Sequence, residues 1–469
     1  MTAPGPLDES VDPAVDTSAS RDAGAPGGRR DPAALPRRAV ARTARLAALP
    51  LGYAGRTTVG WGRRLAGAPA DAVLTGVQQA TAEQVFRTLG ELKGGAMKFG
   101  QAMSVFEAAM PEELARPYRE TLTKLQDAAP PMEPATVRRV LARELGSSWR
   151  TKFASFDEDP AAAASIGQVH RARWHDGREV AVKLQYPGAK EALESDLRQI
   201  SRVARLLGSM MPGIEIGPLL TELRERIVEE LDYDLEAQAQ AVFAAAYEGD
   251  PGIVVPSVVM HTPRLLVTTW MDSEYSLARL IAEGTQQDRD RYGAAYVHFL
   301  FSGPRRTGLL HADPHPGNFR IIGDGRLGVV DFGAVARFPA GSIPLVVGRL
   351  LRRAVEDDYD AVLAGLRTEG FIRSGVDLDA EVLRAYLAPF VEPARVGSFH
   401  FTRDWLRGQA ERVNSPRKED FATALKINLP PEYLLLHRVW VGGIGVLSQL
   451  GAQARFRAIL EDALPGFGD

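Results

Sequence analysis

The spacing of hydrophobic positions changes several times along the chain, and each change predicts a different kind of element. Apolar side chains recur every three or four positions between residues 82 and 127, which predicts helices. Runs from Val169 to Trp174 and from Arg178 to Gln185 are typical of strands, and His175-Asp176-Gly177 between them is typical of a tight turn. The order predicts a helical segment followed by a β-hairpin.

After the hairpin, segments with helical spacing are followed by segments with strand-like spacing, and the rest of the chain is then mostly helical in its spacing. Helical spacing covers residues 189–207 and 219–247, and further strands are predicted from Ile253 to Val259 and from Leu265 to Trp270. Beyond Met271 most of the chain has helical spacing. These patterns predict an α+β protein with a small β-rich lobe, a helical lobe and an N-terminal helical extension.

The N-terminal residues differ from the rest in composition. Residues 1–36 are rich in Pro, Gly, Ala and Asp, which predicts disorder because such a segment buries too little apolar surface. Residues 37–81 are Arg-rich and amphipathic, which suits either an anionic membrane surface or a solvated helix packed on its own protein. The expected parts are therefore a tail at 1–36, an Arg-rich segment at 37–81, a helical extension at 82–135, a β-rich lobe at 136–271 and a helical lobe at 272–469.

Composition narrows the classes of protein that fit. The chain has 469 residues, 45% of them hydrophobic and 25% charged, with a net charge of −3. This balance is typical of a globular protein and disfavours a basic nucleic-acid binder. Cysteine is missing, which excludes disulfides, thiolate metal sites and a Cys nucleophile. The most apolar run, from Tyr433 to Leu450, contains His437 and Arg438 and predicts a buried helix rather than a membrane span.

The candidate chemistry lies in His311-Ala312-Asp313-Pro314-His315-Pro316-Gly317-Asn318 and, after a short apolar strand, in Asp331-Phe332-Gly333. An Asp, an Asn five residues later and a second Asp in this order are typical of the phosphate and metal end of a kinase site. Asp313 is the candidate for positioning or deprotonating the phosphoryl acceptor. Asn318 and Asp331 are candidate Mg²⁺ ligands, because Mg²⁺ prefers oxygen donors. A transition-metal pair of His311 and His315 is a weaker alternative.

Upstream residues add a candidate nucleotide-binding surface. In Val180-Ala181-Val182-Lys183, strand alternation places Ala181 beside Lys183, leaving room for an adenine ring and supplying a cation for phosphates. The alternative is an ordinary strand with a surface Lys. The Ala-rich run Ala161-Ala162-Ala163-Ala164-Ser165 lies where a protein kinase has a Gly-rich loop, so the phosphates are expected to be held differently. A helix N-terminus is the alternative for this run.

An acidic segment supplies candidate partners for Lys183. Glu230, Asp232 and Glu236 belong to a run of five acids in eight residues, and either Glu230 or Glu236 could reach the strand Lys. A solvated acidic face is the alternative. Two features of protein kinases are missing: position 312 is Ala instead of Arg, and no Ala-Pro-Glu follows Gly333. We therefore expect little activity on protein substrates.

Together these residues resemble the UbiB-like (AarF-domain, ABC1-type) atypical kinases. The resemblance covers residues 82–340 and includes Lys98-Phe99-Gly100-Gln101, the Ala-rich run, Ile166-Gly167-Gln168-Val169-His170-Arg171-Ala172, Lys183, Glu230-Leu231-Asp232 and the two downstream motifs. It implies a two-lobed protein-kinase-like fold with an N-terminal extension. It also implies that Lys98 and Gln101 lie on a helix that covers the site, near Glu230 and Asp232.

The resulting prediction is an enzyme that binds ATP and Mg²⁺ and hydrolyses ATP or transfers its γ-phosphate to a small-molecule or lipid acceptor. The resemblance implies a role in isoprenoid-quinone (ubiquinone) or lipid metabolism, in a cytoplasmic protein that contacts the inner face of the membrane peripherally. Two alternatives remain open. One is a nucleotide-binding regulatory scaffold with negligible turnover, and the other is a phosphotransferase resembling aminoglycoside or choline kinases.

Overall fold

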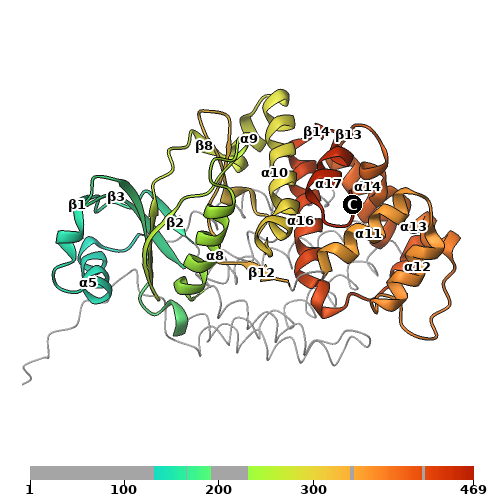
Figure 1. Ribbon diagram of the computed structural model, residues 1–469, viewed down its shortest axis with the longest axis horizontal. Helices are drawn as coiled ribbons and strands as arrows, with labels where there is room; N and C mark the ends of the chain where they lie inside the picture. Colours follow the sequence, from blue (N-terminus) through green and yellow to red (C-terminus); the bar gives the residue numbers. More distant parts are fainter. Residues whose placement is uncertain (1–130, 165, 192–230, 339–342, 415–417, 469) are drawn as a thin grey trace, which may run out of the picture. The chain divides into compact units, whose positions relative to one another are not determined.

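The computed structural model describes residues 131–164, 166–191, 231–338, 343–414 and 418–468. All of these residues fall within one compact unit. The predictions for the tail, the Arg-rich segment and most of the helical extension lie outside the described residues. Within them, the predicted α+β architecture of a β-rich lobe followed by a helical lobe is confirmed (Figure 1).

The first lobe is built on an antiparallel six-stranded sheet with the order β1-β3-β4-β7-β6, in which β2 also pairs with β3. Its strands are β1 (Phe153–Phe156), β2 (Ala162–Ala164), β3 (Gly167–Trp174), β4 (Glu179–Gln185), β6 (Val258–Thr262) and β7 (Leu265–Thr269). Among the described residues, three helical elements accompany the sheet, namely α5 (Pro134–Leu145), the 3-10 turn η2 (Trp149–Lys152) and α8 (Tyr233–Ala246). A hydrophobic core under the sheet includes Val137, Leu141, Val182 and Val267.

The predicted β3–β4 hairpin is confirmed, and its turn has the expected chemistry. Gly177 has φ +93°, a conformation that only glycine adopts without strain. The Asp176 side chain accepts a hydrogen bond from the Arg178 backbone N–H, which closes the turn. The predicted strand from 265 to 270 is also confirmed, as β7.

The prediction of a single strand from Ile253 to Val259 is wrong. The chain forms β5 (Ile253–Val254), which joins a sheet of the second lobe, and then β6, which belongs to the first. Pro256 lies between them and has no backbone N–H to donate to a neighbouring strand. The segment therefore passes from one sheet to the other.

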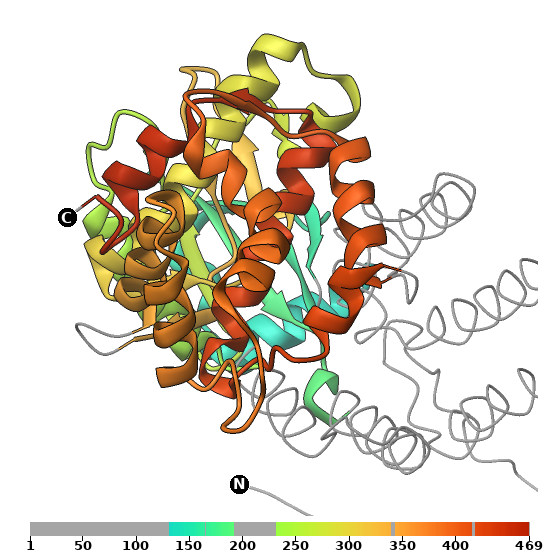
Figure 2. The same ribbon diagram turned by 90° about the vertical axis from the view of Figure 1, so that its right-hand side faces the viewer.

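The second lobe is mostly helical, as Figure 2 shows from its side. Its helices are α9 (Leu277–Glu283), α10 (Gln286–Thr307), α11 (Ile343–Val355), α12 (Tyr359–Thr368), α13 (Ala380–Arg395), α14 (Arg403–Asn414), α15 (Glu419–Ala424), α16 (Leu434–Leu450) and α17 (Phe456–Ala463). Two 3-10 turns are also present, η3 (Pro316–Asn318) and η4 (Pro431–Tyr433). The predicted buried helix near the C-terminus is confirmed as α16, in which Gly443 and Gly445 are buried packing positions.

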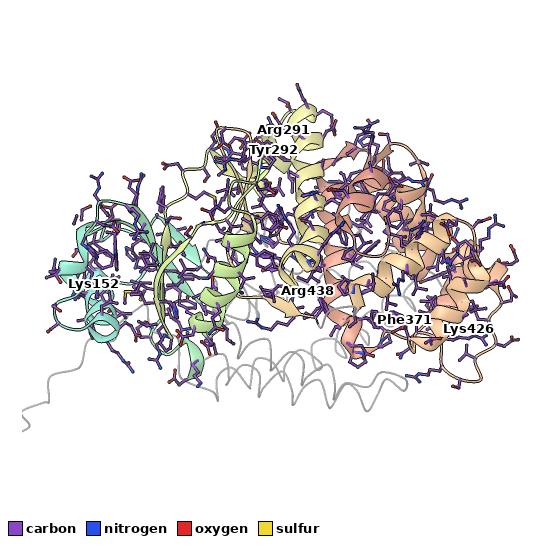
Figure 3. The ribbon with its side chains drawn as sticks, viewed as in Figure 1. Lys152, Arg291, Tyr292, Phe371, Lys426 and Arg438 are labelled. Atoms are coloured by element: carbon purple, nitrogen blue, oxygen red, sulfur yellow. The ribbon has the colours of Figure 1, made fainter. Side chains whose placement is uncertain are left out.

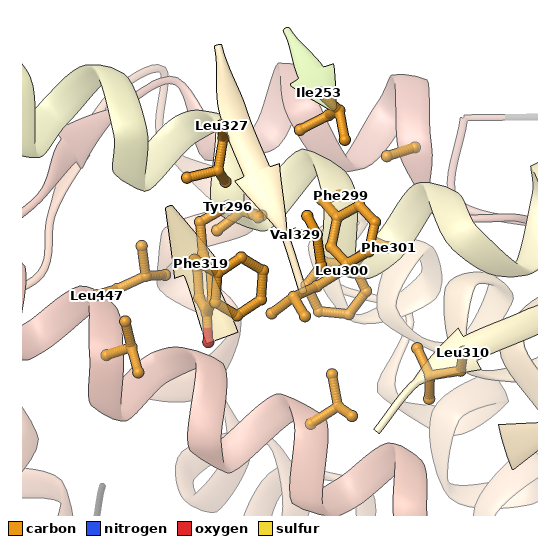
Figure 4. Close-up of a cluster of buried hydrophobic side chains, with 14 of the residues drawn as sticks. Ile253, Tyr296, Phe299, Leu300, Phe301, Leu310, Phe319, Leu327, Val329 and Leu447 are labelled. Carbon is orange, nitrogen blue, oxygen red and sulfur yellow. The ribbon is translucent and has the colours of Figure 1, made fainter. Parts of the chain in front are cut away.

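Short strands in the second lobe carry the downstream motifs. A four-stranded sheet has the order β5-β11-β10-β8, and β9 pairs with β12. These strands are β8 (Tyr275–Ser276), β9 (Leu309–His311), β10 (Phe319–Ile321), β11 (Leu327–Val329) and β12 (Val335–Arg337), with a separate pair formed by β13 (Phe399–His400) and β14 (Gln453–Ala454). Phe319, Leu327 and Val329 pack against α10 in the core that Figure 4 shows. This core holds the motif-bearing loops in place.

Candidate active site

Lys183 lies on the side of β4 that borders a large cavity. Val180, Val182 and Leu184 are fully buried on one face of the strand, whereas Ala181 and Lys183 lie on the other. This is the alternation that the sequence predicts, because successive strand side chains point to opposite faces. The strand therefore brings a small side chain and a cation to the same surface.

Glu236 is the acidic residue that meets Lys183. The Nζ of Lys183 lies 2.7 Å from Oε1 and 3.0 Å from Oε2 of Glu236, so both carboxylate oxygens accept from it. Glu236 is in the first turns of α8, and its side chain is 2% exposed. The Asp232 side chain caps α8 by accepting from the backbone N–H groups of Asp234 and Leu235. Asp232 thus helps to fix the helix that presents Glu236.

The charge of Lys183 is maintained by two carboxylates. Its Nζ lies 3.7 Å from Oδ1 of Asp331 and 5.1 Å from the centre of the Tyr233 ring. Burial by itself lowers the pKa of Lys183, but the negative charges of Asp331 and Glu236 outweigh it and hold that pKa well above its ordinary value. Lys183 is therefore protonated throughout the physiological range.

Asp331 has an unusual backbone conformation that aims its side chain at Lys183. Its φ is 67°, in the left-handed region that few residues other than glycine adopt. The Nε2–H of His311 donates to the Asp331 carbonyl at 2.8 Å, and the Asp331 carboxylate accepts from the Gly333 N–H. The His311 ring also packs edge-on against Phe332. His311 thus supports the strained turn.

The motif loop that follows β9 buries Asp313 and Asn318, which are 5% and 7% exposed. The Asn318 side-chain amide donates to the Asp313 carbonyl at 3.4 Å, and Tyr296 on α10 donates to the Pro314 carbonyl. Arg438 on α16, labelled in Figure 3, places Nη2 3.6 Å from Oδ1 of Asp313. Helix α16 therefore contributes a cation to the motif loop.

A cavity of about 490 Å³ joins these residues, a size typical of ligand pockets. Its lining includes Ala161, Ala162, Ala163, Ala164, Val169, Ala181, Lys183, Glu236, Met271, His315, Asn318, Arg320, Val330 and Asp331. Most of the predicted site residues with described positions thus share one cavity. Asp313 lies in the adjoining loop. No cluster of three or more His, Cys, Asp or Glu side chains that could hold a metal occurs among the described residues.

The Ala-rich run is a strand in its described part, so the alternative of a helix N-terminus is wrong. Ala162 pairs with Val169, and Ala164 pairs with Gly167. Gly167 is required at the end of this hairpin because a Cβ there would lie 2.0 Å from the Leu184 carbonyl oxygen. The run therefore borders the cavity as an extended edge without the conformational freedom of a Gly-rich loop.

A buried polar chain lies directly behind this hairpin. The His170 Nδ1 lies 2.8 Å from the Asp157 carbonyl and its Nε2 lies 2.7 Å from the Gln168 Nε2. The Gln168 Oε1 accepts from the Met132 N–H at 2.7 Å. These contacts assign the Nδ1–H tautomer of neutral His170, because a carbonyl can only accept. Burial lowers the pKa of His170, although the Asp157 carbonyl and nearby acids oppose this.

Several predicted residues lie outside the described residues, namely Lys98, Gln101, Ser165 and Glu230. The sequence analysis did not predict that Arg438 contacts the motif loop or that Arg320 lines the cavity. Each position is unusual in the sequence, since Arg438 is a charge inside the most apolar run and Arg320 is a charge between two buried strand residues. Neither signal identifies the residue that the cation meets.

Comparison with known proteins identifies the family of this chain. A family model described as the ABC1 atypical kinase-like domain matches residues 124–365, a range that contains all of the residues lining the cavity. This chain belongs to the ABC1 atypical kinase-like family. The match ends within α12, so the helices that follow, including α16 with Arg438, lie beyond it.

Relatives of the ABC1 family are found in several kingdoms. The chain is 30% identical to the mitochondrial atypical kinase COQ8 of Saccharomyces cerevisiae over 55% of this chain and 51% of that protein. It is 29% identical to the chloroplastic ACTIVITY OF BC1 COMPLEX KINASE 3 of Arabidopsis thaliana over 73% of this chain and 47% of that protein. The chain thus spans about half the length of the curated relatives it matches.

A solved structure extends the ABC1-type fold over most of the chain. The complex of Rv3197 with erythromycin from Mycobacterium tuberculosis matches with a TM-score of 0.65 and 43% identity. The match covers 86% of this chain and all of that one. Among the described residues, no helix is long and apolar enough to cross a membrane.

Proposed function

We propose that this chain binds ATP with Mg²⁺ and hydrolyses it or transfers its γ-phosphate to a small-molecule or lipid acceptor. The observation that carries the proposal is Lys183 held between Glu236 and Asp331 at one cavity. Burying a pair of opposite charges costs desolvation free energy that their attraction often does not recover, so stability alone gives little reason for this arrangement. A fixed cation beside a carboxylate is suited to binding a polyphosphate with its metal ion.

Four residues at or beside the cavity have roles in this proposal. Lys183 binds the α- and β-phosphates, and Glu236 fixes the direction of its ammonium group. Asp313 positions the acceptor hydroxyl or water, and Arg438 holds the Asp313 carboxylate. Catalysis of this kind consists of positioning and charge neutralisation, because phosphoryl transfer needs little covalent help from the protein.

The donor set at the cavity fits Mg²⁺. The Asp331 side chain is 27% exposed, and Asn318, whose amide carries an oxygen donor, belongs to the same lining. Mg²⁺ takes one or two protein oxygens together with phosphate oxygens and water, which matches this pair. When bound, the ion would neutralise charge on the phosphates.

The acceptor and the pathway are proposed from the family. The resemblance to UbiB-like proteins, with relatives named as a mitochondrial atypical kinase and a chloroplastic ACTIVITY OF BC1 COMPLEX KINASE, supports a role in isoprenoid-quinone or lipid metabolism. We place the protein in the cytoplasm with peripheral membrane contact through residues 37–81. Unchanged quinone pools in a deletion strain would contradict the quinone assignment.

The 43% identical solved structure, a complex with erythromycin, supports a second ligand for this chain. We infer that this chain also binds erythromycin. Isothermal titration with erythromycin, with and without ATP, tests this ligand. Absence of binding both by heat and by equilibrium dialysis would contradict it.

A regulatory scaffold is the second candidate, favoured by the Arg438 cation beside Asp313. A cation there competes with an acceptor for the carboxylate, which suits binding without turnover. The open pocket of an aminoglycoside-type kinase is less well supported, because the Ala-rich strand borders this cavity.

ATP turnover by purified protein with Mg²⁺ tests the proposed function, with and without anionic lipid vesicles. The test variant is Asp331→Asn, and the matched control is Asp324→Asn, an exposed Asp of the neighbouring β10–β11 turn. We expect turnover that is lost in Asp331→Asn and retained in Asp324→Asn. Tight nucleotide binding without turnover under either condition would favour the scaffold.

A further inference from the structure

Arg320 occupies a position in β10 where its side chain must face the cavity. Its neighbours Phe319 and Ile321 are 0% and 2% exposed and pack into the core, where Figure 4 labels Phe319. Side chains alternate along a strand, so Arg320 points the opposite way. It lines the cavity together with Met271 and Val330.

The Arg320 guanidinium has no acidic partner within the described part of the chain. Burial lowers the pKa of Arg320, and no neighbouring charge contributes to this shift. Arg326, in the same hairpin, is different because it forms an ion pair with Asp324. A half-buried cation without a partner is unfavourable, so a ligand that supplies electron density would bind to it favourably.

The strand register places Arg320 away from the proposed metal ligands. Asn318 ends η3 and Arg320 is the second residue of β10, and two residues correspond to about 7 Å along an extended chain. Val330, beside Asp331, donates its N–H to the Asn318 carbonyl, whereas Arg320 pairs with Gly328, further from Asp331. Arg320 is therefore at the part of the cavity beyond the phosphate and metal residues.

Small or apolar side chains of the first lobe line the same cavity. Val169 and Ala181 are on β3 and β4, on the face that carries Lys183. Met271 follows the end of β7, and a Cβ at Gly328 would lie 2.2 Å from its sulfur, so Met271 packs closely on the β10–β11 hairpin. This arrangement places apolar side chains and one planar cation along the same cavity.

We propose that Arg320 recognises the nucleotide base, with its guanidinium against one face of the purine and Val169 and Ala181 toward the other. Planar guanidinium groups stack on aromatic and base rings, which a Lys ammonium does not do. The inference rests on the proposed function, since it assigns the base end of the same ATP site. It makes Arg320 a residue that recognises the base of the nucleotide.

The test compares binding of ATP and of inorganic tripolyphosphate, each with Mg²⁺, to the full chain by isothermal titration. The variants are Arg320→Met, which keeps the length of the side chain, Arg320→Lys, which keeps its charge, and the control Arg326→Met. We expect Arg320→Met to weaken ATP binding about three- to thirtyfold while tripolyphosphate binding stays within about twofold. Arg320→Lys should resemble Arg320→Met, and Arg326→Met should resemble wild type.

Two results would overturn the inference alone. Equal weakening of ATP and tripolyphosphate by Arg320→Met would show that the guanidinium contacts phosphate, and unchanged ATP binding would show that it contacts no part of the nucleotide. Failure of the wild-type chain to bind ATP would instead overturn the proposed function and the inference with it. Unfolding temperatures of the variants establish that each is folded.

Discussion

The ammonium group of Lys183 lies 2.7 Å from the Glu236 carboxylate, although the two residues are 53 positions apart. Glu236 is nearly inaccessible to water, so its charge depends on this contact for compensation. The pair also joins β4 to α8, which makes the position of the helix and the direction of the ammonium group interdependent. Stability and nucleotide binding should therefore respond together to a change at either residue.

Replacing Glu236 by Gln should lower the free energy of unfolding by about 3 kcal/mol, because it leaves a largely buried ammonium group with one carboxylate fewer. Urea denaturation measures this change. Glu356→Gln is the control, since Glu356 forms an exposed pair with Arg352 and should cost no more than about 0.5 kcal/mol. Equal effects of the two substitutions would show that the buried pair has no special role in stability.

Replacing Arg438 by Gln should reduce kcat about tenfold and change the KM for ATP much less, because Arg438 contacts Asp313 rather than the residues proposed to bind phosphates. Arg438→Lys should retain part of the activity. Arg457→Gln, in an exposed pair on α17, serves as the control. An increase in KM with unchanged kcat would contradict a role through Asp313.

The buried chain through His170 should make stability depend on pH below neutrality. Burial lowers the pKa of His170 in the folded protein, so the unfolded chain binds a proton first as pH falls through about 6.5. Stability from neutral His170 is therefore present above that pH and decreases below it, by up to about 1.4 kcal/mol per pH unit. Urea midpoints between pH 7.5 and 5.5 should fall less in His170→Gln than in wild type. The same slope in His170→Gln as in the control His175→Gln, an exposed turn residue, would refute this assignment.

Two glycine substitutions should have opposite effects on stability. Gly167→Ala places a Cβ 2.0 Å from the Leu184 carbonyl oxygen and should destabilise by about 1–3 kcal/mol. Gly408 is exposed in α14 with open space around it, so Gly408→Ala should stabilise by about 0.5–1 kcal/mol. Thermal unfolding measures both. A tolerated Gly167→Ala would show that the β2–β3 hairpin shifts to admit the methyl group.

Local sequence patterns predicted much of this fold, because the spacing of hydrophobic positions and the residues of a turn are local properties. The β3–β4 hairpin followed from its turn residues, and α16 followed from its length and apolar content. The split at Pro256 was missed because the apolar run around it continues on both sides, and only the missing N–H separates the strands.

The candidate site was predictable to the extent that its residues occur in motifs. Residue types and spacing identified Lys183, Asp313, Asn318 and Asp331, but left Glu230 and Glu236 as equal candidates. The choice of Glu236 depends on how α8 packs beneath the sheet, which is a tertiary property. The contact of Arg438 with Asp313 spans 125 positions and has no local signature.

The most direct test of the central claim is the effect of Mg²⁺ on ATP affinity in wild type, Asp331→Asn and Asp324→Asn. If Asp331 binds the metal beside Lys183, Mg²⁺ should tighten ATP binding about tenfold or more in wild type and in Asp324→Asn, and have little effect in Asp331→Asn. The same Mg²⁺ dependence in all three proteins would contradict the proposed site.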